Sequence, residues 1–178
     1  GSYTFAIAFY SFFEILVRFG LGTLLTREVA KGREDANRFF SNVIAVRTKL
    51  WLASLPVVLL IVLGYWRWGG LIAEEAMAIG LFALALLFAG FSDAVTATFN
   101  GYEKMEFPAG LASAIAVSKV ALGALVLLPP LEWGFVGLAG VALLMNAVQA
   151  LWLYVLLRQK LFQPSRETDP VLQRDMMR

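Results

Sequence analysis

The sequence predicts an all-α membrane protein that crosses the bilayer several times. Hydrophobic residues make up 60% of the chain and charged residues only 16%, whereas roughly 25% of the residues of a soluble domain are charged. Long apolar stretches alternate with short charged, aromatic or proline-containing segments. Each stretch is long enough, at about 1.5 Å per helical residue, to cross a hydrocarbon core of about 30 Å. We therefore expect five transmembrane helices, at about 3–25, 43–64, 75–100, 109–128 and 134–157.

The first predicted span, 3–25, contains two charged residues, Glu14 and Arg18. Two central charges cost roughly 5 to 7 kcal/mol, about as much as the apolar residues of the span contribute. One helical turn separates the two side chains, so they can pair and face a protein interior or a wet cavity. A structural pair and a ligand contact are equally open for the pair as a whole. For Arg18 a ligand contact is slightly favoured, because one carboxylate cannot accept hydrogen bonds from all five N–H donors of the guanidinium group.

The segment that follows, TREVAKGREDANRFF, is rich in charges of both signs. This pattern predicts a short amphipathic helix-turn-helix in the membrane interface. Arg47 and Lys49 lie near the start of the second span, and we expect both to extend outward to the polar boundary. Pro56 should bend the second span.

The remaining spans have clear boundaries in the sequence. Tyr65, Trp66 and Trp68 form a predicted aromatic belt before the third span. The fourth span starts after Pro108 and ends at a proline pair, and the fifth opens with GFVGLAG, whose small residues allow helices to pack closely.

The basic residues predict the orientation of the chain. All but three of the fifteen Lys and Arg residues fall in 26–50, in 92–108 or after Leu157. The positive-inside rule places these three segments in the cytoplasm. Gly1 would then lie outside, which predicts that a span precedes it and that the chain is a piece of a longer polytopic protein.

Polar side chains within the later spans are candidate site residues. Lys119 shares a helix stripe with small residues, and a salt bridge to Glu14 or Asp93 and a cavity role are equally open for it. Asn146 and Gln149 lie one turn apart on the fifth span, where such residues more often join helices than bind a ligand.

Asp93, Thr96 and Asn100 form a further polar stripe near the cytoplasmic end of the third span. For Asp93 the favoured interpretation is that water simply solvates the side chain. The alternative, a part in coupling or gating, applies to Asp93 and also to Arg27. Arg18 and Lys119 together would form a cationic lumen that suits a diphosphate-linked lipid.

The composition limits the chemistry that the chain can perform. The sequence contains no Cys and no His, which excludes disulfides, thiol nucleophiles, imidazole bases and the usual zinc ligands. We predict no catalytic residue, no metal site, no cofactor and no nucleic-acid partner.

Two segments resemble a known family. GSYTFAIAFYSFFEILVRFGLGTLLTREVAK has a glycine-leucine pair followed by an arginine, at Gly20, Leu21 and Arg27, and ATFNGYEKM spans 97–105. They resemble the segment after the first helix and the junction of the fourth and fifth helices in the polysaccharide-biosynthesis, or oligosaccharide flippase, family. That family belongs to the MATE-like superfamily, which also contains multidrug and toxin extruders. Arg18 stands about where members carry an acidic residue, so the role of that acid does not transfer.

The resemblance implies a fold of twelve to fourteen helices in two lobes. Residues 1–160 would be part of the N-terminal lobe, with helices two to six of the family, and 161–178 a cytoplasmic linker towards the second lobe. It further implies a flippase in a bacterial or archaeal cytoplasmic membrane that moves a lipid-linked oligosaccharide by alternating access. Membrane lipid and polysaccharide polymerases or glycosyltransferases are the expected partners.

Two other functions stay open. A drug or cation extruder of the same superfamily would use acidic cavity residues, and Glu14 and Asp93 are candidates. A membrane-embedded sugar-phosphate transferase would need acidic metal ligands near the cytoplasmic face, where Glu103 and Glu106 lie close to Asp93 in the sequence.

Overall fold

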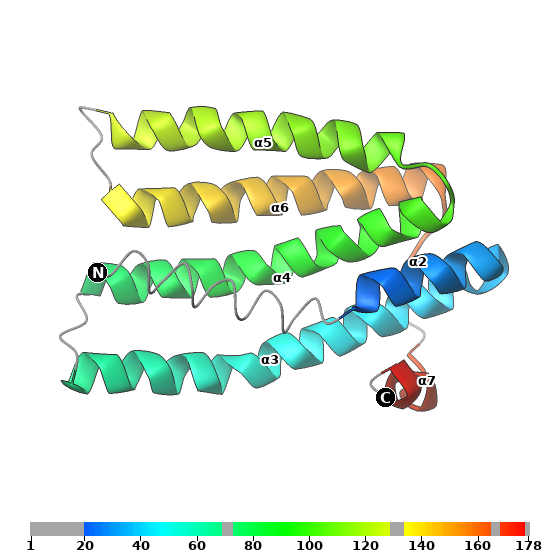
Figure 1. Cartoon of the computed structure of the whole chain (residues 1–178), viewed down its shortest axis with the longest axis horizontal. Coiled ribbons are helices and arrows are strands. Elements are labelled where there is room, and N and C mark those ends of the chain that lie inside the picture. Colours follow the sequence, from blue (N-terminus) through cyan, green and yellow to red (C-terminus); the bar gives the residue numbers. More distant parts are fainter. Residues whose placement is uncertain (1–19, 69–72, 129–133, 165–167, 177–178) are drawn as a thin grey trace.

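The computed structural model describes residues 20–68, 73–128, 134–164 and 168–176. Within these ranges the elements are α2 (Leu21–Lys31), a 3-10 turn (Arg33–Asp35), α3 (Ala36–Trp68), α4 (Ala73–Gly101), α5 (Glu106–Leu127), α6 (Gly134–Lys160) and α7 (Pro170–Met176). Figure 1 shows α5, α6, α4 and α3 in that order across a bundle, with α2 lying over α3 and α4.

The long helices confirm the predicted class of all-α membrane protein. In the described ranges, α3 to α6 each contain a stretch that is long and apolar enough to cross a membrane. They correspond to the second, third, fourth and fifth predicted spans. The first predicted span, 3–25, lies outside the described residues except for 20–25.

Two predicted boundaries were wrong. The first span was expected to end near Leu25, but Gly20 adopts a left-handed φ of 66° and a helix begins directly after it at Leu21. The second span was expected to begin at 43, but α3 begins at Ala36. Its first turns stay helical because Ala36, Phe40 and Val43 form a buried apolar stripe at helical spacing. The predicted helix-turn-helix is therefore α2 followed by the start of α3.

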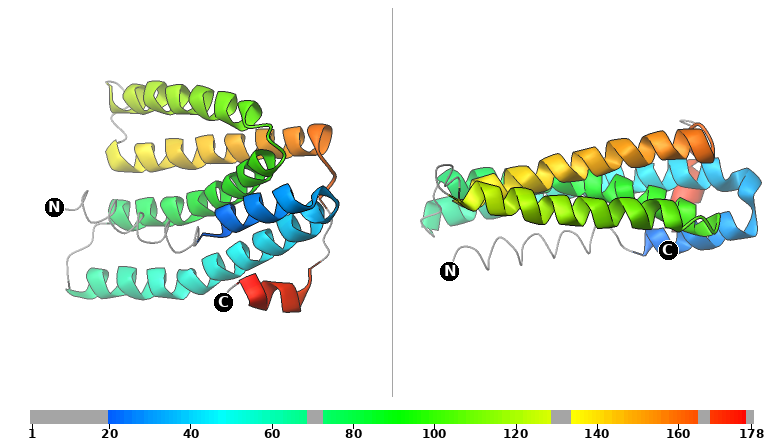
Figure 2. Two further views of the ribbon diagram at one scale, coloured as in Figure 1. Left: turned by 45° about the vertical axis from the view of Figure 1, so that its right-hand side comes forward. Right: turned by 90° about the horizontal axis from the view of Figure 1, so that it is seen from above.

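Helix α4 is the centre of the bundle. It packs against α2, α3 and α6, while α5 packs mainly on α6 (Figure 2). Amphipathic α2 contributes Leu21, Leu25 and Val29, which are spaced four residues apart and are all buried. They join Val95 and Phe99 of α4 in the hydrophobic core.

The contact of α2 with α4 depends on a glycine. A Cβ on Gly101 would lie 2.7 Å from Val29 Cβ and 2.9 Å from the Thr26 carbonyl oxygen. Thr26 Oγ1 also donates a hydrogen bond of 3.0 Å to the Ala97 carbonyl oxygen. The α2 backbone therefore lies directly on α4, with no room for a side chain at position 101.

Helix α3 is bent. Pro56 lies inside it, and Figure 1 shows a change in the direction of α3 about halfway along its length. Proline removes one backbone hydrogen bond and its ring crowds the preceding turn, as the sequence predicts for this position.

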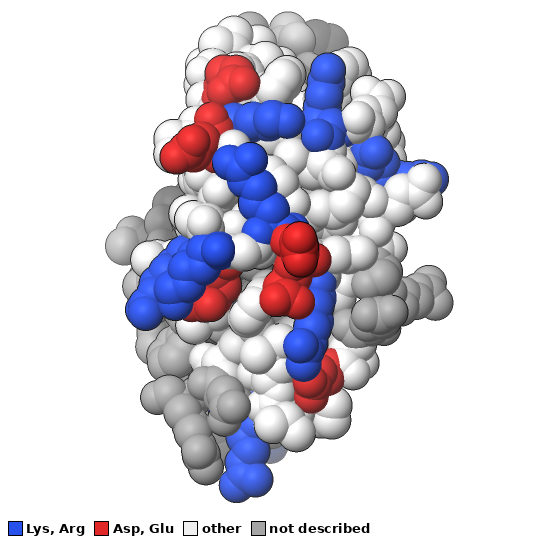
Figure 3. Space-filling model, turned by 90° about the vertical axis from the view of Figure 1, so that its right-hand side faces the viewer, with Lys and Arg blue, Asp and Glu red and all other residues white. Residues whose placement is uncertain are grey.

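One end of the bundle carries most of the charged side chains of the described residues. The turn after α2, the α4–α5 turn, the end of α6 and α7 all lie at the right-hand end in Figure 1. Figure 3 shows Lys and Arg side chains spread over this end, with Asp and Glu among them. The three basic segments identified in the sequence thus share one end, which we call the basic end.

The tail after α6 folds back on α3. Asp169 caps α7 by accepting a hydrogen bond of 2.9 Å from the Val171 backbone N–H, and it forms a salt bridge of 2.5 Å with Arg38. Asn37 Nδ2 donates to the Gln163 carbonyl oxygen at 3.1 Å. The described part of the predicted linker 161–178 is therefore docked on the bundle.

A buried polar contact holds α7 in place. The fully buried Asn42 accepts hydrogen bonds from the Asp169 backbone N–H at 2.8 Å and from Gln173 Nε2 at 3.0 Å. Lys49 Nζ donates to Gln173 Oε1 at 2.6 Å. Lys49 is exposed and extends to α7 at the basic end, which agrees with the expectation that it extends outward.

Docking of α7 should weaken in acid. The hydrogen bond from Arg38 and those from the Val171 and Leu172 backbone N–H groups hold the pKa of Asp169 below its ordinary value of 3.8. Because the folded-state pKa is depressed, this contribution is fully present above the unfolded pKa of 3.8 and is lost as the pH falls through the folded pKa. We expect the protection factor of 170–176, which is the intrinsic exchange rate divided by the measured rate at the same pH, to be high at pH 7 and to fall as the pH drops through the folded pKa of Asp169.

Arg38→Gln is the matched variant for this test. Without the guanidinium, the pKa of Asp169 rises and protection should be lost at a higher pH than in the unmodified chain. The same pH dependence in both proteins would show that the Asp169–Arg38 pair does not control docking.

Candidate functional site

A polar groove of about 620 Å³ lies between α2 and α4, towards the basic end. Its walls carry hydroxyl, amide, carboxylate and guanidinium groups. The lining residues are Gly20, Gly22, Thr23, Thr26, Arg27, Ala30, Asp93, Thr96, Ala97 and Asn100. We call this feature the polar groove.

Helical spacing explains which residues line the groove. On α4 they recur at three or four residues, from Asp93 through Thr96 to Asn100, and so lie on one face. This confirms the polar stripe expected from the sequence. On α2 the same spacing brings Arg27 to the rim, where its side chain is 73% exposed and its Nε lies 3.8 Å from Glu28 Oε1.

The polar groove reaches one member of a buried ion pair, because Asp93 lines it and Arg47 does not. Arg47 Nη2 of α3 lies 2.5 Å from Asp93 Oδ2, and Nη1 donates to the Gly90 carbonyl oxygen. The Arg47 side chain is only 4% exposed, while that of Asp93 is 32% exposed. A buried guanidinium needs such a partner, because an isolated charge inside a protein is costly.

Two expectations are corrected here. Arg47 does not extend outward, because α3 begins at Ala36 and Arg47 continues the buried stripe of Phe40 and Val43. Asp93 is not simply solvated but paired with Arg47. Asp93 is thus already engaged by a cation other than Lys119.

Gly22 gives the groove access to this ion pair. A Cβ on Gly22 would lie 3.2 Å from Asp93 Oδ2 and 3.5 Å from Arg47 Nη2. The absence of a side chain lets α2 pass close over the pair. The polar groove therefore reaches the Asp93 side chain, which is 32% exposed.

Lys119 and Asn146 meet between α5 and α6. Lys119 Nζ donates a hydrogen bond of 2.7 Å to Asn146 Oδ1, and Asn146 is only 7% exposed. Asn146 thus joins two helices, as the sequence predicts. Gln149 is half-buried one turn further along α6. A Cβ on Gly123 would touch Leu138 at 3.4 Å, so the same two helices also pack closely at a small residue.

The predicted site residues fall into separate groups. Arg27 and Asp93 share the polar groove, while Lys119 and Asn146 meet between α5 and α6. Glu14 and Arg18 lie outside the described residues, so their predicted pairing stays a prediction. Arg47 was missed as a site residue, although its spacing of four residues from Val43 could have placed it on the buried face.

Acidic residues in the described part of the chain do not gather into a candidate metal site. No group of three His, Cys, Asp or Glu side chains there could hold one ion. Glu103 and Glu106 are exposed at the α4–α5 turn.

Comparison with known proteins gives one match. The family model described as "Polysaccharide biosynthesis protein" matches residues 1–178, which is the whole chain. The search of curated proteins and the search of solved structures found no significant match. The family match agrees with the resemblance seen in the sequence and with the four long apolar helices among the described residues. The chain therefore belongs to the polysaccharide biosynthesis protein family and is a membrane protein with a role in that process.

Proposed function

We propose that the protein is part of a flippase that moves a lipid-linked oligosaccharide across the cell membrane for polysaccharide biosynthesis. The observation that carries this proposal is the polar groove of about 620 Å³ towards the basic end of the bundle. The positive-inside rule assigns the basic end to the cytoplasm, where the sugar headgroup is loaded.

The chemistry of the groove suits such a headgroup. Thr23, Thr96 and Asn100 offer hydroxyl and amide groups that match sugar hydroxyls, and Arg27 at the rim matches a phosphate. The volume lies within the range of about 300–1,000 Å³ that is typical of small-ligand sites.

Movement of the substrate requires a second lobe. In this proposal 1–160 is part of the N-terminal lobe, 161–178 leads to the second lobe, and the route lies between the two lobes. Arg18 and Lys119 contribute positive charge to the route, with Asn146 orienting the Lys119 ammonium group. Polysaccharide polymerases or glycosyltransferases would supply or receive the substrate, and the protein itself transports rather than catalyses.

The alternatives have weaker support. A cation extruder would use Asp93 as a cation-binding acid, but Arg47 already engages this carboxylate. A sugar-phosphate transferase would use clustered acids, and Asp93, Glu103 and Glu106 do not form such a group among the described residues.

Export in cells tests the proposal. Arg18→Ala combined with Lys119→Ala in the intact transporter should lower surface polysaccharide at least tenfold, because the phosphates of the substrate lose both cations. Lys119→Arg in place of Lys119→Ala should restore part of the export, since the charge is kept. Lys31→Ala on the exposed face of α2 is the control and should export normally.

The amount of each variant in the membrane must be measured in parallel. Normal export by the double variant at normal abundance would refute the cationic route. Loss of export by Lys31→Ala to the same degree would show that charge at the basic end, rather than in the route, limits transport.

A further inference from the structure

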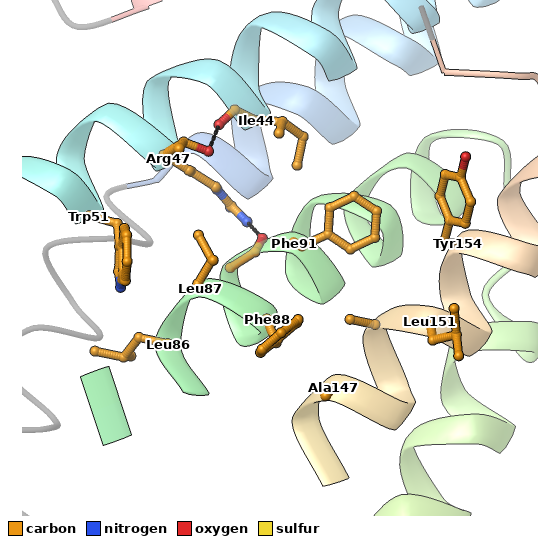
Figure 4. A pocket seen from close by; sticks show the side chains of 13 residues that line it. Ile44, Arg47, Trp51, Leu86, Leu87, Phe88, Phe91, Ala147, Leu151 and Tyr154 are labelled. Carbon is orange, nitrogen blue, oxygen red and sulfur yellow. Dashed lines mark hydrogen bonds between the residues drawn. The ribbon is translucent and has the colours of Figure 1, made fainter. Parts of the chain in front are cut away.

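A second cavity lies between α3, α4 and α6, and it shares no lining residue with the polar groove. Its volume is about 340 Å³, and Figure 4 shows aromatic and aliphatic side chains around it. Along α6 it extends from Tyr154 to Ala147, and along α3 from Ile44 to Trp51. Seven helical residues span about 10 Å, so the cavity is an elongated slot parallel to the helices.

Three polar groups in the wall of this slot are engaged by other parts of the protein. Trp51 Nε1 donates to the Ala83 carbonyl oxygen at 2.7 Å, and Thr48 Oγ1 donates to the Ile44 carbonyl oxygen at 2.9 Å. Arg47 donates to the Gly90 carbonyl oxygen and is neutralised by Asp93. Most of the other lining residues are aliphatic or aromatic, so the slot favours an apolar occupant.

The slot opens on an exposed apolar face of the bundle. Leu151 lines it and is 66% exposed, and its neighbour Trp152 is 59% exposed. Both belong to α6, one of the helices that can cross a membrane. A lipid chain in the bilayer can thus enter without unfolding a helix.

A cation lies where the slot approaches the basic end. The Arg158 guanidinium is stacked over the Tyr154 ring, with its carbon 5.7 Å from the ring centroid. Leu151, Tyr154 and Arg158 lie on one face of α6, because they are spaced three and four residues apart. A guanidinium stacked on a ring still presents its N–H edge, which suits a phosphate oxygen.

We propose that this slot binds an anionic phospholipid, with one acyl chain between α3 and α6 and the phosphate at Arg158. The elongated shape of the slot and its mostly apolar wall select a chain, and the cation at its entrance selects a negatively charged headgroup. The site is separate from the polar groove, so the inference does not depend on the proposed transport function.

Lipid retention by the purified protein in detergent tests this proposal. Native mass spectrometry would count dioleoyl phosphatidylglycerol and dioleoyl phosphatidylcholine bound to the chain. We expect phosphatidylglycerol to be retained preferentially, and Arg158→Gln to weaken its binding about fivefold, the effect of one cation near a membrane surface. Lys160→Gln is the matched control, because this cation lies over Phe107, 5.6 Å from its centroid and away from the slot.

A second pair of variants tests the acyl-chain site. Ala147→Phe fills the slot and should reduce binding of phosphatidylglycerol, whereas Val148→Phe, at a neighbouring position that is already 40% exposed, should not. Equal losses from Arg158→Gln and Lys160→Gln, or unchanged binding in Ala147→Phe, would overturn the proposal. Displacement of phosphatidylglycerol by substoichiometric polyprenyl phosphate would also overturn it, since the slot would then belong to the substrate lipid.

Discussion

Replacing Gly101 with alanine should push α2 away from α4 and destabilise the protein. The added Cβ would meet Val29 Cβ at 2.7 Å and the Thr26 carbonyl oxygen at 2.9 Å, and a backbone atom cannot rotate aside as a flexible side chain can. Overpacking in a tight core costs about 1–3 kcal/mol, and we expect the upper part of that range here. The free energy of unfolding in mixed micelles, measured by denaturant titration, would show the loss.

Gly80→Ala is the control for this prediction. Gly80 also lies within α4, but a Cβ there would meet nothing within 4 Å. Alanine is the better helix former by about 1 kcal/mol, so this variant should be neutral or slightly more stable. Equal destabilisation by both substitutions would mean that α2 can shift to accommodate the Cβ at position 101, so that the close contact is not the cause of the lost stability.

Asp93→Asn should be among the most damaging single changes in the bundle. It removes the carboxylate from Arg47, whose side chain is 4% exposed, and leaves a buried guanidinium without that partner. Breaking a buried pair in this way costs about 3–5 kcal/mol. Arg47→Gln should cost less, because the Asp93 side chain is 32% exposed and water can solvate it.

The double variant Arg47→Gln with Asp93→Asn completes a thermodynamic cycle. Its loss of stability should be clearly smaller than the sum of the two single losses, because no buried charge remains. Strictly additive losses would show that the two residues stabilise the fold independently of each other.

The sequence predicted the long helices well, because a bilayer imposes a length and a composition on every span. It could not predict the break at Gly20. The chain stays apolar through Leu21 and Leu25, and the left-handed φ of Gly20 marks where α2 begins. Hydropathy indicates whether a segment lies in an apolar or a polar environment, but it does not indicate where the backbone changes direction.

The site was harder to predict than the fold, because its contacts join residues that are far apart in the chain. Arg47 looked like a boundary residue when its own segment was considered alone, since its partner Asp93 comes 46 residues later. Asn42 and Gln173 are separated by 131 residues, and no local pattern indicates that one will bind the other. Such pairs are fixed by tertiary packing.

The distance between Arg47 and Asp93 in the sequence also affects how the protein inserts into the membrane during translation. Helix α3 leaves the ribosome first and carries an arginine whose carboxylate partner has not yet been synthesised. An unneutralised arginine costs about 2.5–3.5 kcal/mol at the centre of a span, and less for Arg47, which lies in the first half of α3. The pair forms only once α4 has emerged as far as Asp93, near the end of that helix. We therefore expect insertion of α3 to be more favourable together with α4 than alone.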